Sequence, residues 1–262
     1  MSSIATDIVA GVARITLNRP EKRNALDRAT IEALTQSLRE CAANGAVRVV
    51  QLTGAGAVFC AGADLAEMQA QLHAGEADNL KDAERLATLL SVLDSMPKPT
   101  LARVNGDGYG GALGLLGACD IVLAVAEAKF AFTEVRLGII PAVISPFVLG
   151  KMGESAARRY FLTAETLTAA DLKELGLVHE IVSADLLDAT AERIIETLLR
   201  AAPGAQAEAK TLIRDVAHAS ARHRAAASTE AAARLARLRV QPEAQEGFSA
   251  FFAKRKPSWR RD

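Results

Sequence analysis

The alternation of strand-like and helix-like segments constrains the fold of this 262-residue chain more than any other feature. Short runs rich in β-branched and apolar residues, such as VRVVQLTG and DIVLAVA, are typical of buried strands. Between them lie segments in which apolar residues recur every three or four positions, as in amphipathic helices. Strands that alternate with helices bury their apolar faces by packing in layers, so we expect an α/β fold.

Turn and capping signals place the individual elements. Apolar residues alternate on both sides of Ala10 and Gly11, which predicts a β-hairpin over residues 4–17. Asp27 is a good N-cap for a helix that should end near residues 44–45. From Leu186 onward, helical segments follow one another without strands. Between these parts we expect a strand over 47–54, a short helix from Asp64, a helix over 78–95, a strand over 100–106, a helix over 110–118 and a strand over 120–126.

Charge and cysteine content argue against several classes of protein. Lysine and arginine together number 31, as do aspartate and glutamate, so the basic excess of nucleic-acid or membrane-surface binders is missing. Charges interrupt every apolar segment before it reaches the length of a membrane span. The first residues lack the pattern of a signal peptide, and the three cysteines have no metal-ligand spacing. We therefore expect a cytoplasmic protein with reduced thiols and no metal.

Two loops rich in small residues are candidate binding sites. CAGADL, residues 60–65, and GYGGALG, residues 108–114, each follow an expected strand and lead into a helix. Amide groups in the first turn of a helix have no intrahelical partner, so each loop could offer one donor to a single oxygen, as an oxyanion hole does. The alternative is a tight loop or close packing of a helix on a strand. Neither loop has the spacing of a dinucleotide or phosphate loop.

Glu134 is the candidate for proton chemistry. It lies in the apolar stretch FTEVRLGIIPAVISP, in which Pro141 stiffens the loop that follows. A carboxylate in such surroundings is either capped by nearby backbone donors or kept for acid–base work with a raised pKa. The serines have no nucleophile-elbow context. The basic end AKRKPSWRRD is either a solvated terminus or a phosphate contact through Lys254 or Lys256.

Taken together, these segments resemble the crotonase family, the enoyl-CoA hydratase/isomerase superfamily. The matching pieces, in the family's order and spacing, are ITLNRPEKRNAL, FCAGADLAEM, RVNGDGYGGALGLLGACDI, EVRLGIIP, ARRYFLTAE, LGLVHEIV and FFAKRKPSW. The resemblance implies a spiral of ββα units over residues 1–195, followed by a helical oligomerisation region over 196–262. It also implies a homotrimer or a dimer of trimers.

The resemblance further implies a coenzyme A thioester as the substrate, with no separate cofactor because coenzyme A is part of that substrate. By the same resemblance, the backbone N–H groups of Ala63 and Gly111 would hold the thioester oxygen, and Glu134 would be the catalytic acid and base. The other residues that it implies for substrate binding are Lys22, Asn24, Ala25, Leu26, Ala61, Gly62, Asp64, Leu65, Tyr109, Gly110, Gly114, Arg136 and Pro141.

Gly114 marks a departure from the family pattern. Typical hydratases carry two catalytic glutamates, and the family spacing (134 − 114 = 20) puts the first of them at the position of Gly114. In detail the sequence resembles bacterial methylglutaconyl-CoA and isohexenylglutaconyl-CoA hydratases, whose substrates carry a carboxylate. We expect Gly114 to leave room for that carboxylate, and Arg136 or His73 to bind it.

Three functions fit this pattern. The first is hydration of a branched, carboxylated enoyl-CoA such as 3-methylglutaconyl-CoA, with Glu134 as the single acid and base. The second is isomerisation of a β,γ double bond to the α,β position, which moves one proton between carbons and needs one base. The third is a non-catalytic scaffold that binds acyl-CoA. An intact pair of oxyanion donors beside a glutamate favours the two enzymes over the scaffold.

Overall fold

The computed structural model describes residues 2–71, 75–217 and 242–259. Within these residues, six strands form a sheet in the order β1-β2-β3-β4-β6-β9. The first two pair as an antiparallel hairpin and the later pairings are all parallel. The α/β class and the hairpin are thereby confirmed. The strands are β1 (Ile4–Val9), β2 (Val12–Leu17), β3 (Val49–Gly54), β4 (Thr100–Val104), β6 (Ile121–Val125) and β9 (Glu180–Val182).

A small second sheet was not predicted from the sequence. It contains β5 (Gly108–Tyr109), β7 (Lys129–Ala131) and β8 (Leu167–Thr168), which are too short to produce a visible alternation of apolar residues. An isolated bridge joins Cys60 to Gly108, and the Tyr109 amide donates to the Cys60 carbonyl at 3.1 Å. This sheet therefore brings the two loops of small residues side by side.

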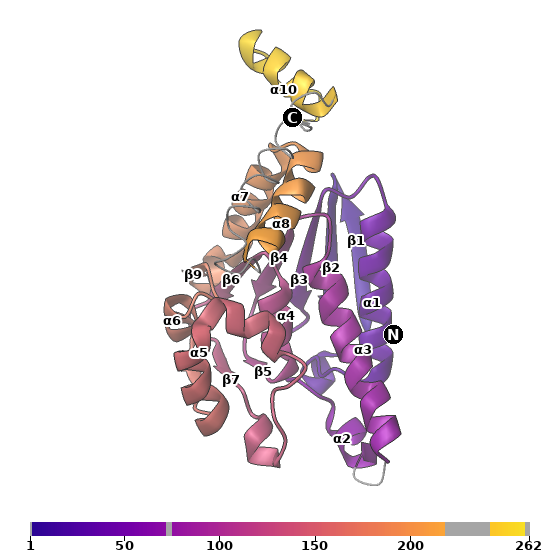
Figure 1. Cartoon of the computed structure of the whole chain (residues 1–262), viewed down its shortest axis with the longest axis vertical. Coiled ribbons are helices and arrows are strands. Elements are labelled where there is room, and N and C mark those ends of the chain that lie inside the picture. The colour runs from indigo at the N-terminus through magenta and orange to yellow at the C-terminus, as the bar shows by residue number, and fades with distance from the viewer. Residues whose placement is uncertain (1, 72–74, 218–241, 260–262) are drawn as a thin grey trace.

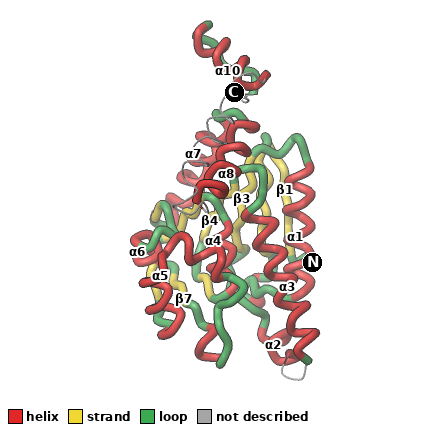
Figure 2. Tube along the Cα trace, viewed as in Figure 1, coloured by secondary structure: helices red, strands yellow, loops and turns green. Residues whose placement is uncertain are grey.

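The helices surround the sheets, with α1 and α3 side by side along one face (Figures 1 and 2). The N-cap of α1 is Asp27, as expected, and its carboxylate accepts from the Thr30 amide at 2.8 Å. The helices are α1 (Arg28–Ala43), α2 (Leu65–Gln71), α3 (Glu76–Asp94), α4 (Gly111–Ala118), α5 (Ser145–Thr163), α6 (Ala169–Glu174), α7 (Leu187–Leu199), α8 (Pro203–Ala217) and α10 (Pro242–Phe252). Three short 3₁₀ helices are η1 (Pro20–Lys22), η2 (Glu134–Leu137) and η3 (Ala184–Leu186).

The helix α4 is the centre of the core. Every residue from 112 to 118 is buried, and the sequence GALGLLGA contains no polar side chain. A helix that is apolar on all sides is stable only when other elements cover it completely. Here α3 and α5 pack against α4, and burial of each of its leucines contributes about 1.5–3 kcal/mol. The N-terminus of α4 is thereby fixed in the interior, where its amides face the candidate site.

Beyond residue 186, the described parts of the chain form α7, α8 and α10 and no strand, as expected. The boundary that we expect at residues 195/196 stays a prediction, although α7 runs across it and packs on the core through Leu187, Ala191 and Ile195. The α10 helix lies beyond α8 (Figure 1), where the Glu243 carboxylate accepts from two amides at the start of α8. His218 and His223 lie outside the described residues. None of the described helices has the length and apolarity that a bilayer crossing requires.

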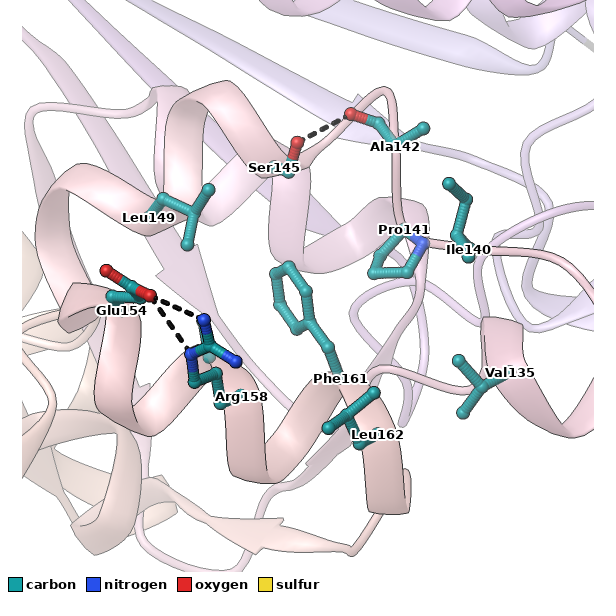
Figure 3. A pocket seen from close by; sticks show the side chains of 11 residues that line it. Val135, Ile140, Pro141, Ala142, Ser145, Leu149, Glu154, Arg158, Phe161 and Leu162 are labelled. Carbon is teal, nitrogen blue, oxygen red and sulfur yellow. Dashed lines mark hydrogen bonds and ion pairs between the residues drawn. The ribbon is translucent and has the colours of Figure 1, made fainter.

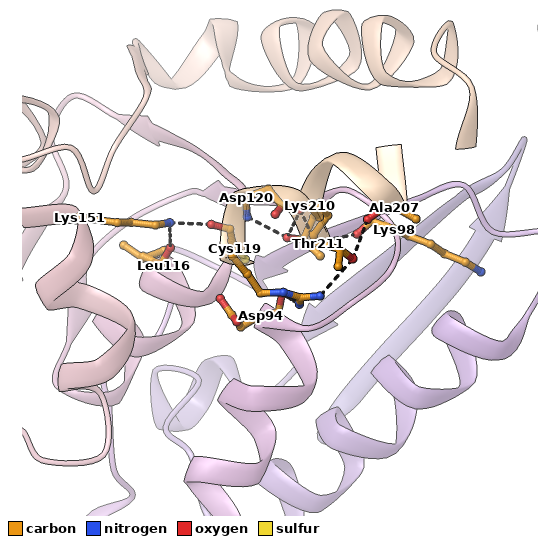
Figure 4. Close-up of polar contacts among 11 residues, drawn as sticks. Asp94, Lys98, Leu116, Cys119, Asp120, Lys151, Ala207, Lys210 and Thr211 are labelled. Atoms are coloured by element: carbon orange, nitrogen blue, oxygen red, sulfur yellow. Dashed lines mark hydrogen bonds and ion pairs between the residues drawn. The ribbon is translucent and has the colours of Figure 1, made fainter. Parts of the chain in front are cut away.

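A polar cluster holds the C-terminal end of α4 (Figure 4). The Lys151 ammonium group, on α5, donates to the Cys119 carbonyl at 2.7 Å. Burial lowers the pKa of Lys151, and a positive charge at a helix C-terminus is favourable. Asp120 accepts from the Thr100 amide at 2.7 Å and pairs with Lys210 at 2.6 Å. The end of α4 opposite Gly111 is therefore tied to three other elements.

Replacing Asp120 with alanine should lower the free energy of unfolding by about 3 kcal/mol, because the change leaves the Lys210 ammonium group without its carboxylate. The Lys210 side chain is only 12% exposed, so water cannot replace the lost partner well. A matched control is Asp188→Ala, which breaks the pair with Arg103 at a carboxylate that is 81% exposed, and it should cost less than about 1 kcal/mol. Urea denaturation measures both, and equal costs would contradict this account of the cluster.

Candidate functional site

A cavity of about 670 Å³ lies between α1, α3, the start of α4 and the segment from residue 134 to residue 144. Its walls are largely apolar. Ala63, Gly111 and Glu134, which come from three separate parts of the chain, all line it. The other lining residues are Leu26, Arg28, Ile31, Glu67, Met68, Asn79, Asp82, Ala83, Arg85, Leu86, Leu137 and residues 139–144. The structure thus brings together the three residues expected to carry the chemistry.

Gly111 borders this cavity, and its amide is left free by the way in which α4 begins. Gly111 is the first residue of the helix, so its N–H group has no carbonyl one turn earlier to bond. The preceding Gly110 has φ 50° and ψ −114°, a backbone conformation that residues with a side chain rarely adopt. Its own amide donates to the Ala131 carbonyl at 3.0 Å, which fixes the chain as it turns into the helix.

The Ala63 amide is left free by the pairing of its neighbours. The Leu26 amide donates to the Gly62 carbonyl at 2.8 Å, and the Asp64 amide donates to the Leu26 carbonyl at 3.1 Å. In a parallel bridge of this kind, the residue between the two partners points its own N–H and C=O groups away from the neighbouring strand. Two fixed amides thus border one cavity, which is the arrangement that stabilises negative charge on a carbonyl oxygen.

Glu134, at the start of η2, lines the same cavity as these amides. Its Oε1 atom would be 3.4 Å from a Cβ atom at Gly110, an ordinary contact distance, so the carboxylate lies against the turn that leads into α4. Its Oε2 atom is buried and has no hydrogen-bond partner among the described residues. Burial raises the pKa of Glu134 above the ordinary value of 4.5. A partly desolvated carboxylate with one oxygen free of partners is suited to take up and return a proton.

The pH dependence of activity should reflect this environment. If Glu134 acts as a base, kcat/KM should fall with acid around an apparent pKa above 4.5, because burial favours the protonated form. The measurement is a pH profile of kcat/KM for the wild type and for Glu67→Gln, which removes another carboxylate of the cavity wall and should keep the same acid limb. If the acid limb of the profile disappears in Glu67→Gln, the limb reports Glu67 and not Glu134.

Several residues expected to bind substrate make hydrogen bonds and ion pairs that hold the loops in place. The Asn24 side chain is buried and donates to two carbonyls of the loop before Phe59, at 2.8 and 2.7 Å. The Arg19 guanidinium bridges Asp27 and Asp64 at 3.0 Å each, and also donates to the Ala25 carbonyl. Asn24, Ala25 and Asp64 thus fix the strand-to-helix turns that carry Leu26 and Ala63. Their role in substrate binding stays a prediction.

Of the remaining expected residues, Leu26 and Pro141 line the cavity. Lys22 and Leu65 are exposed and Ala61 is partly buried, so their place along a coenzyme A path stays a prediction. A Cβ atom at Gly62 would lie 2.7 Å from the Tyr109 carbonyl, which shows that this glycine permits close packing of the two loops. Lys254 and Lys256 are exposed and follow α10, and their contact with phosphates also stays a prediction. His73 lies outside the described residues.

Two expectations need correction. Arg136 does not line the cavity: its Nη2 donates at 2.6 Å to the Ala164 carbonyl, just beyond the end of α5. Gly114 does not leave room for a substrate carboxylate, because a Cβ atom there would lie 2.6 Å from Cγ2 of Ile144 and 2.9 Å from Cδ1 of Leu90. Apolar side chains already fill the space that the missing Cβ leaves.

Sequence reasoning missed two arginines of the cavity wall. Arg28 pairs with Asp82 at 3.1 Å, and Arg85 pairs both with Asp82 and with Glu32. All but Glu32 line the cavity. Charged residues at these helix positions usually face solvent, so nothing in the sequence distinguished them. Among the described residues that line this cavity, Arg28 and Arg85 are the ones that carry a positive charge, so a negatively charged substrate group would meet them.

A second cavity of about 440 Å³ lies on the other side of residues 140–142 (Figure 3). Its wall is formed by apolar side chains, with the Phe161 ring between Leu149 and Pro141. Glu154 and Arg158 also line it, but they pair with each other at 2.9 Å. No unpaired titratable group of the described residues lines this cavity, so we place the chemistry in the first cavity.

Comparison with known proteins agrees with this geometry. The family model described as enoyl-CoA hydratase/isomerase matches residues 7–262. The chain is 35% identical to the mevalonyl-coenzyme A hydratase sidH of Aspergillus fumigatus, covering 94% of this chain and 90% of the relative. It is 31% identical to the 2,3-dehydroadipyl-CoA hydratase of Escherichia coli, covering 99% of both. The crystal structure of an enoyl-CoA hydratase from Shewanella pealeana superposes with a TM-score of 0.93 at 41% identity, covering 98% and 96%.

Proposed function

This chain belongs to the enoyl-CoA hydratase/isomerase family and has its fold, and from that premise we propose that it adds water across the α,β double bond of an enoyl-CoA thioester. One observation carries the proposal: Glu134, a half-buried carboxylate whose Oε2 atom has no hydrogen-bond partner among the described residues, and two free backbone amides, of Ala63 and Gly111, border the same cavity. Hydration of a thioester-conjugated double bond needs a base for water, an acid for the α-carbon and stabilisation of an enolate oxygen.

The two amides supply the electrostatic part of this mechanism. The thioester carbonyl oxygen would accept from the Ala63 and Gly111 N–H groups, which draw electron density from the double bond and make its β-carbon electrophilic. As water adds, negative charge develops on that oxygen. Fixed donors of this kind stabilise such charge by about 3–4 kcal/mol each, because they need no reorganisation during the reaction.

Glu134 supplies the proton transfers. Its carboxylate takes a proton from water while the water oxygen forms a bond to the β-carbon and the double-bond electrons move to the thioester oxygen. The protonated Glu134 then returns one proton to the α-carbon as the carbonyl re-forms. The carboxylate is thus regenerated, and the net change is addition of one water molecule. One group can serve both steps because its pKa, raised by burial, lies closer to neutrality.

For the acyl group, we propose a branched enoyl-CoA that carries its own carboxylate, such as 3-methylglutaconyl-CoA. Two relatives, a 2,3-dehydroadipyl-CoA hydratase and a mevalonyl-coenzyme A hydratase, support an acyl group with a polar end. Arg28 and Arg85 support a carboxylate, because they share the Asp82 carboxylate and each guanidinium has five N–H donors. They replace Arg136 as the candidate contact.

Isomerisation is the second candidate, and one observation favours it. Apart from Glu134, the wall next to Gly111 is formed by Leu26, Leu86 and Ile144, which cannot exchange protons. A single base is sufficient to move a proton from the α- to the γ-carbon, whereas most hydrations are helped by a second acid. A purely structural acyl-CoA scaffold has less support, because it needs no desolvated carboxylate. Assembly as a homotrimer or a dimer of trimers stays a prediction.

A substrate panel tests the proposal. The purified protein is incubated with 3-methylglutaconyl-CoA, but-2-enoyl-CoA and but-3-enoyl-CoA, and the loss or gain of the conjugated thioester absorbance is followed. We expect hydration of the α,β-unsaturated esters, with 3-methylglutaconyl-CoA the best substrate. Arg85→Met should raise KM for the carboxylated ester about ten-fold and leave but-2-enoyl-CoA unaffected. Turnover of but-3-enoyl-CoA alone would establish the isomerase instead.

A further inference from the structure

We infer that Ile144, seated in a notch at Gly114, determines how much bulk the acyl group can carry at its β- and γ-carbons. The inference rests on the proposed function, since it concerns the acyl end of the same cavity. Ile144 lines that cavity, yet its side chain is only 2% exposed. Most of its side chain therefore points into the protein. The position of that side chain determines the depth of the cavity.

The notch exists because position 114 has no side chain. A Cβ atom at Gly114 would lie 2.6 Å from Cγ2 and 3.1 Å from Cβ of Ile144, distances that real Cβ atoms do not show or show only under compression. The two residues are therefore matched in shape: the isoleucine occupies the volume that the glycine leaves on α4. Leu90, which is fully buried, closes the notch from α3.

The Ile144 backbone is held as firmly as its side chain. Its carbonyl accepts from the Phe147 and Val148 amides at 3.1 and 3.3 Å, so the residue is fixed to the first turn of α5. Pro146 follows in that turn and restricts the backbone further. Because the main chain cannot retreat, a change in the volume of the notch must be taken up by movement of the side chain toward or away from the cavity.

The position of the notch along α4 tells which acyl carbons it meets. Gly111, whose amide would hold the thioester oxygen, precedes Gly114 by three residues, or about 4.5 Å along the helix axis. Leu26 and Leu86 lie next to Gly111, since a Cβ atom there would be 3.5 and 3.9 Å from their methyl carbons. Ile144 therefore lies deeper than the thioester, beside the β- and γ-carbons.

This geometry predicts opposite effects for changes on the two sides of the notch. Ile144→Ala removes volume from the cavity floor and should admit bulkier β-substituents, and Ile144→Val should do so to a smaller extent. Gly114→Ala adds a methyl group that displaces Ile144 into the cavity, so it should exclude those substituents. In the double variant, the methyl group at position 114 fills part of the space vacated at position 144, and selectivity should return toward that of the wild type.

The test compares kcat/KM for 3-methylbut-2-enoyl-CoA and but-2-enoyl-CoA in the full-length protein. We expect the branched-to-linear ratio to rise at least about ten-fold in Ile144→Ala, to fall at least about ten-fold in Gly114→Ala and to lie within about three-fold of the wild type in the double variant. Val148→Ala is the matched control, because Val148 packs against Gly117 in the same way one turn along α4 but does not line the cavity. It should leave the ratio unchanged.

A binding measurement keeps this inference separate from the proposed function. Calorimetric titration with the saturated esters 3-methylbutanoyl-CoA and butanoyl-CoA reports the same selectivity without turnover, and Ile144→Val serves if Gly114→Ala does not fold. If no variant turns over any enoyl ester but the binding ratios shift as expected, the proposed function fails and the inference stands. The inference would be overturned if the branched-to-linear ratios of kcat/KM and of affinity both stay within about two-fold of the wild type in Ile144→Ala and Ile144→Val.

Discussion

Glu134→Gln should lower kcat by about 10²- to 10⁴-fold, because glutamine cannot exchange a proton with water or with the α-carbon. The change keeps the size and shape of the side chain, so substrate affinity should stay nearly constant and the loss should fall on kcat. Stopped-flow or steady-state assays with the best ester of the panel measure the effect. Glu67→Gln, on the same cavity wall, is the control and should keep activity within a few-fold of the wild type.

The same variant should be at least as stable as the wild type near neutral pH. Burial raises the pKa of Glu134 in the folded state, so the folded protein binds this proton more tightly than the unfolded chain does. The corresponding stabilisation is complete below the unfolded-state value and is lost as the pH rises through the folded-state pKa. Glutamine avoids the cost of keeping an ionised carboxylate partly out of water. Full activity in Glu134→Gln would contradict the role of Glu134 in proton transfer. A melting temperature below that of the wild type would contradict the proposal that burial destabilises its ionised form.

Gly111→Pro should lower kcat by about 10²- to 10³-fold, because proline has no N–H group and one oxyanion donor is lost. Proline is tolerated at the first position of a helix, where the amide has no intrahelical partner, so α4 should still form. Its fixed φ near −65° is also compatible with a helical first residue. The expected loss therefore reports the missing donor rather than a broken helix.

Gly111→Ala is the matched control for this prediction. It keeps the amide, and its methyl group would meet only ordinary contacts at 3.5 Å to Leu26 and 3.9 Å to Leu86. We expect activity within about ten-fold of the wild type. Far-ultraviolet circular dichroism and a melting curve show whether each variant is folded. If alanine and proline reduce kcat equally in folded proteins, the Gly111 amide is not an oxyanion donor.

Much of the framework could be predicted because local signals agreed with the final fold. The Asp27 cap, the turn at Ala10 and Gly11, and the apolar run that forms α4 each act within a few residues. The strands of the small second sheet were missed because elements of two or three residues have no periodicity. They are held by pairing with distant segments, and the sequence contains no local trace of those partners.

The residues that come together at the candidate site were largely predictable, whereas the other residues of the cavity wall were not. Ala63, Gly111 and Glu134 were found from their motifs and do line one cavity. The prediction that Gly114 leaves room for a substrate carboxylate was wrong. A glycine in a sequence does not show which group occupies the space beside it, and the fold shows that Ile144 does. Arg136 was expected at the cavity but lies outside it, and its guanidinium donates to the Ala164 carbonyl beyond a helix end. The sequence does not distinguish these two positions for an arginine. Such outcomes depend on contacts between distant segments.

Isotope labelling tests the central claim most directly. The wild-type protein is incubated with 3-methylglutaconyl-CoA and with but-2-enoyl-CoA in water enriched in oxygen-18, and the acyl-CoA products are analysed by mass spectrometry. Water addition predicts a product heavier than the substrate by one labelled water molecule, with the label on the β-carbon. A product of unchanged mass with a shifted double bond, or no product with either ester, would contradict it.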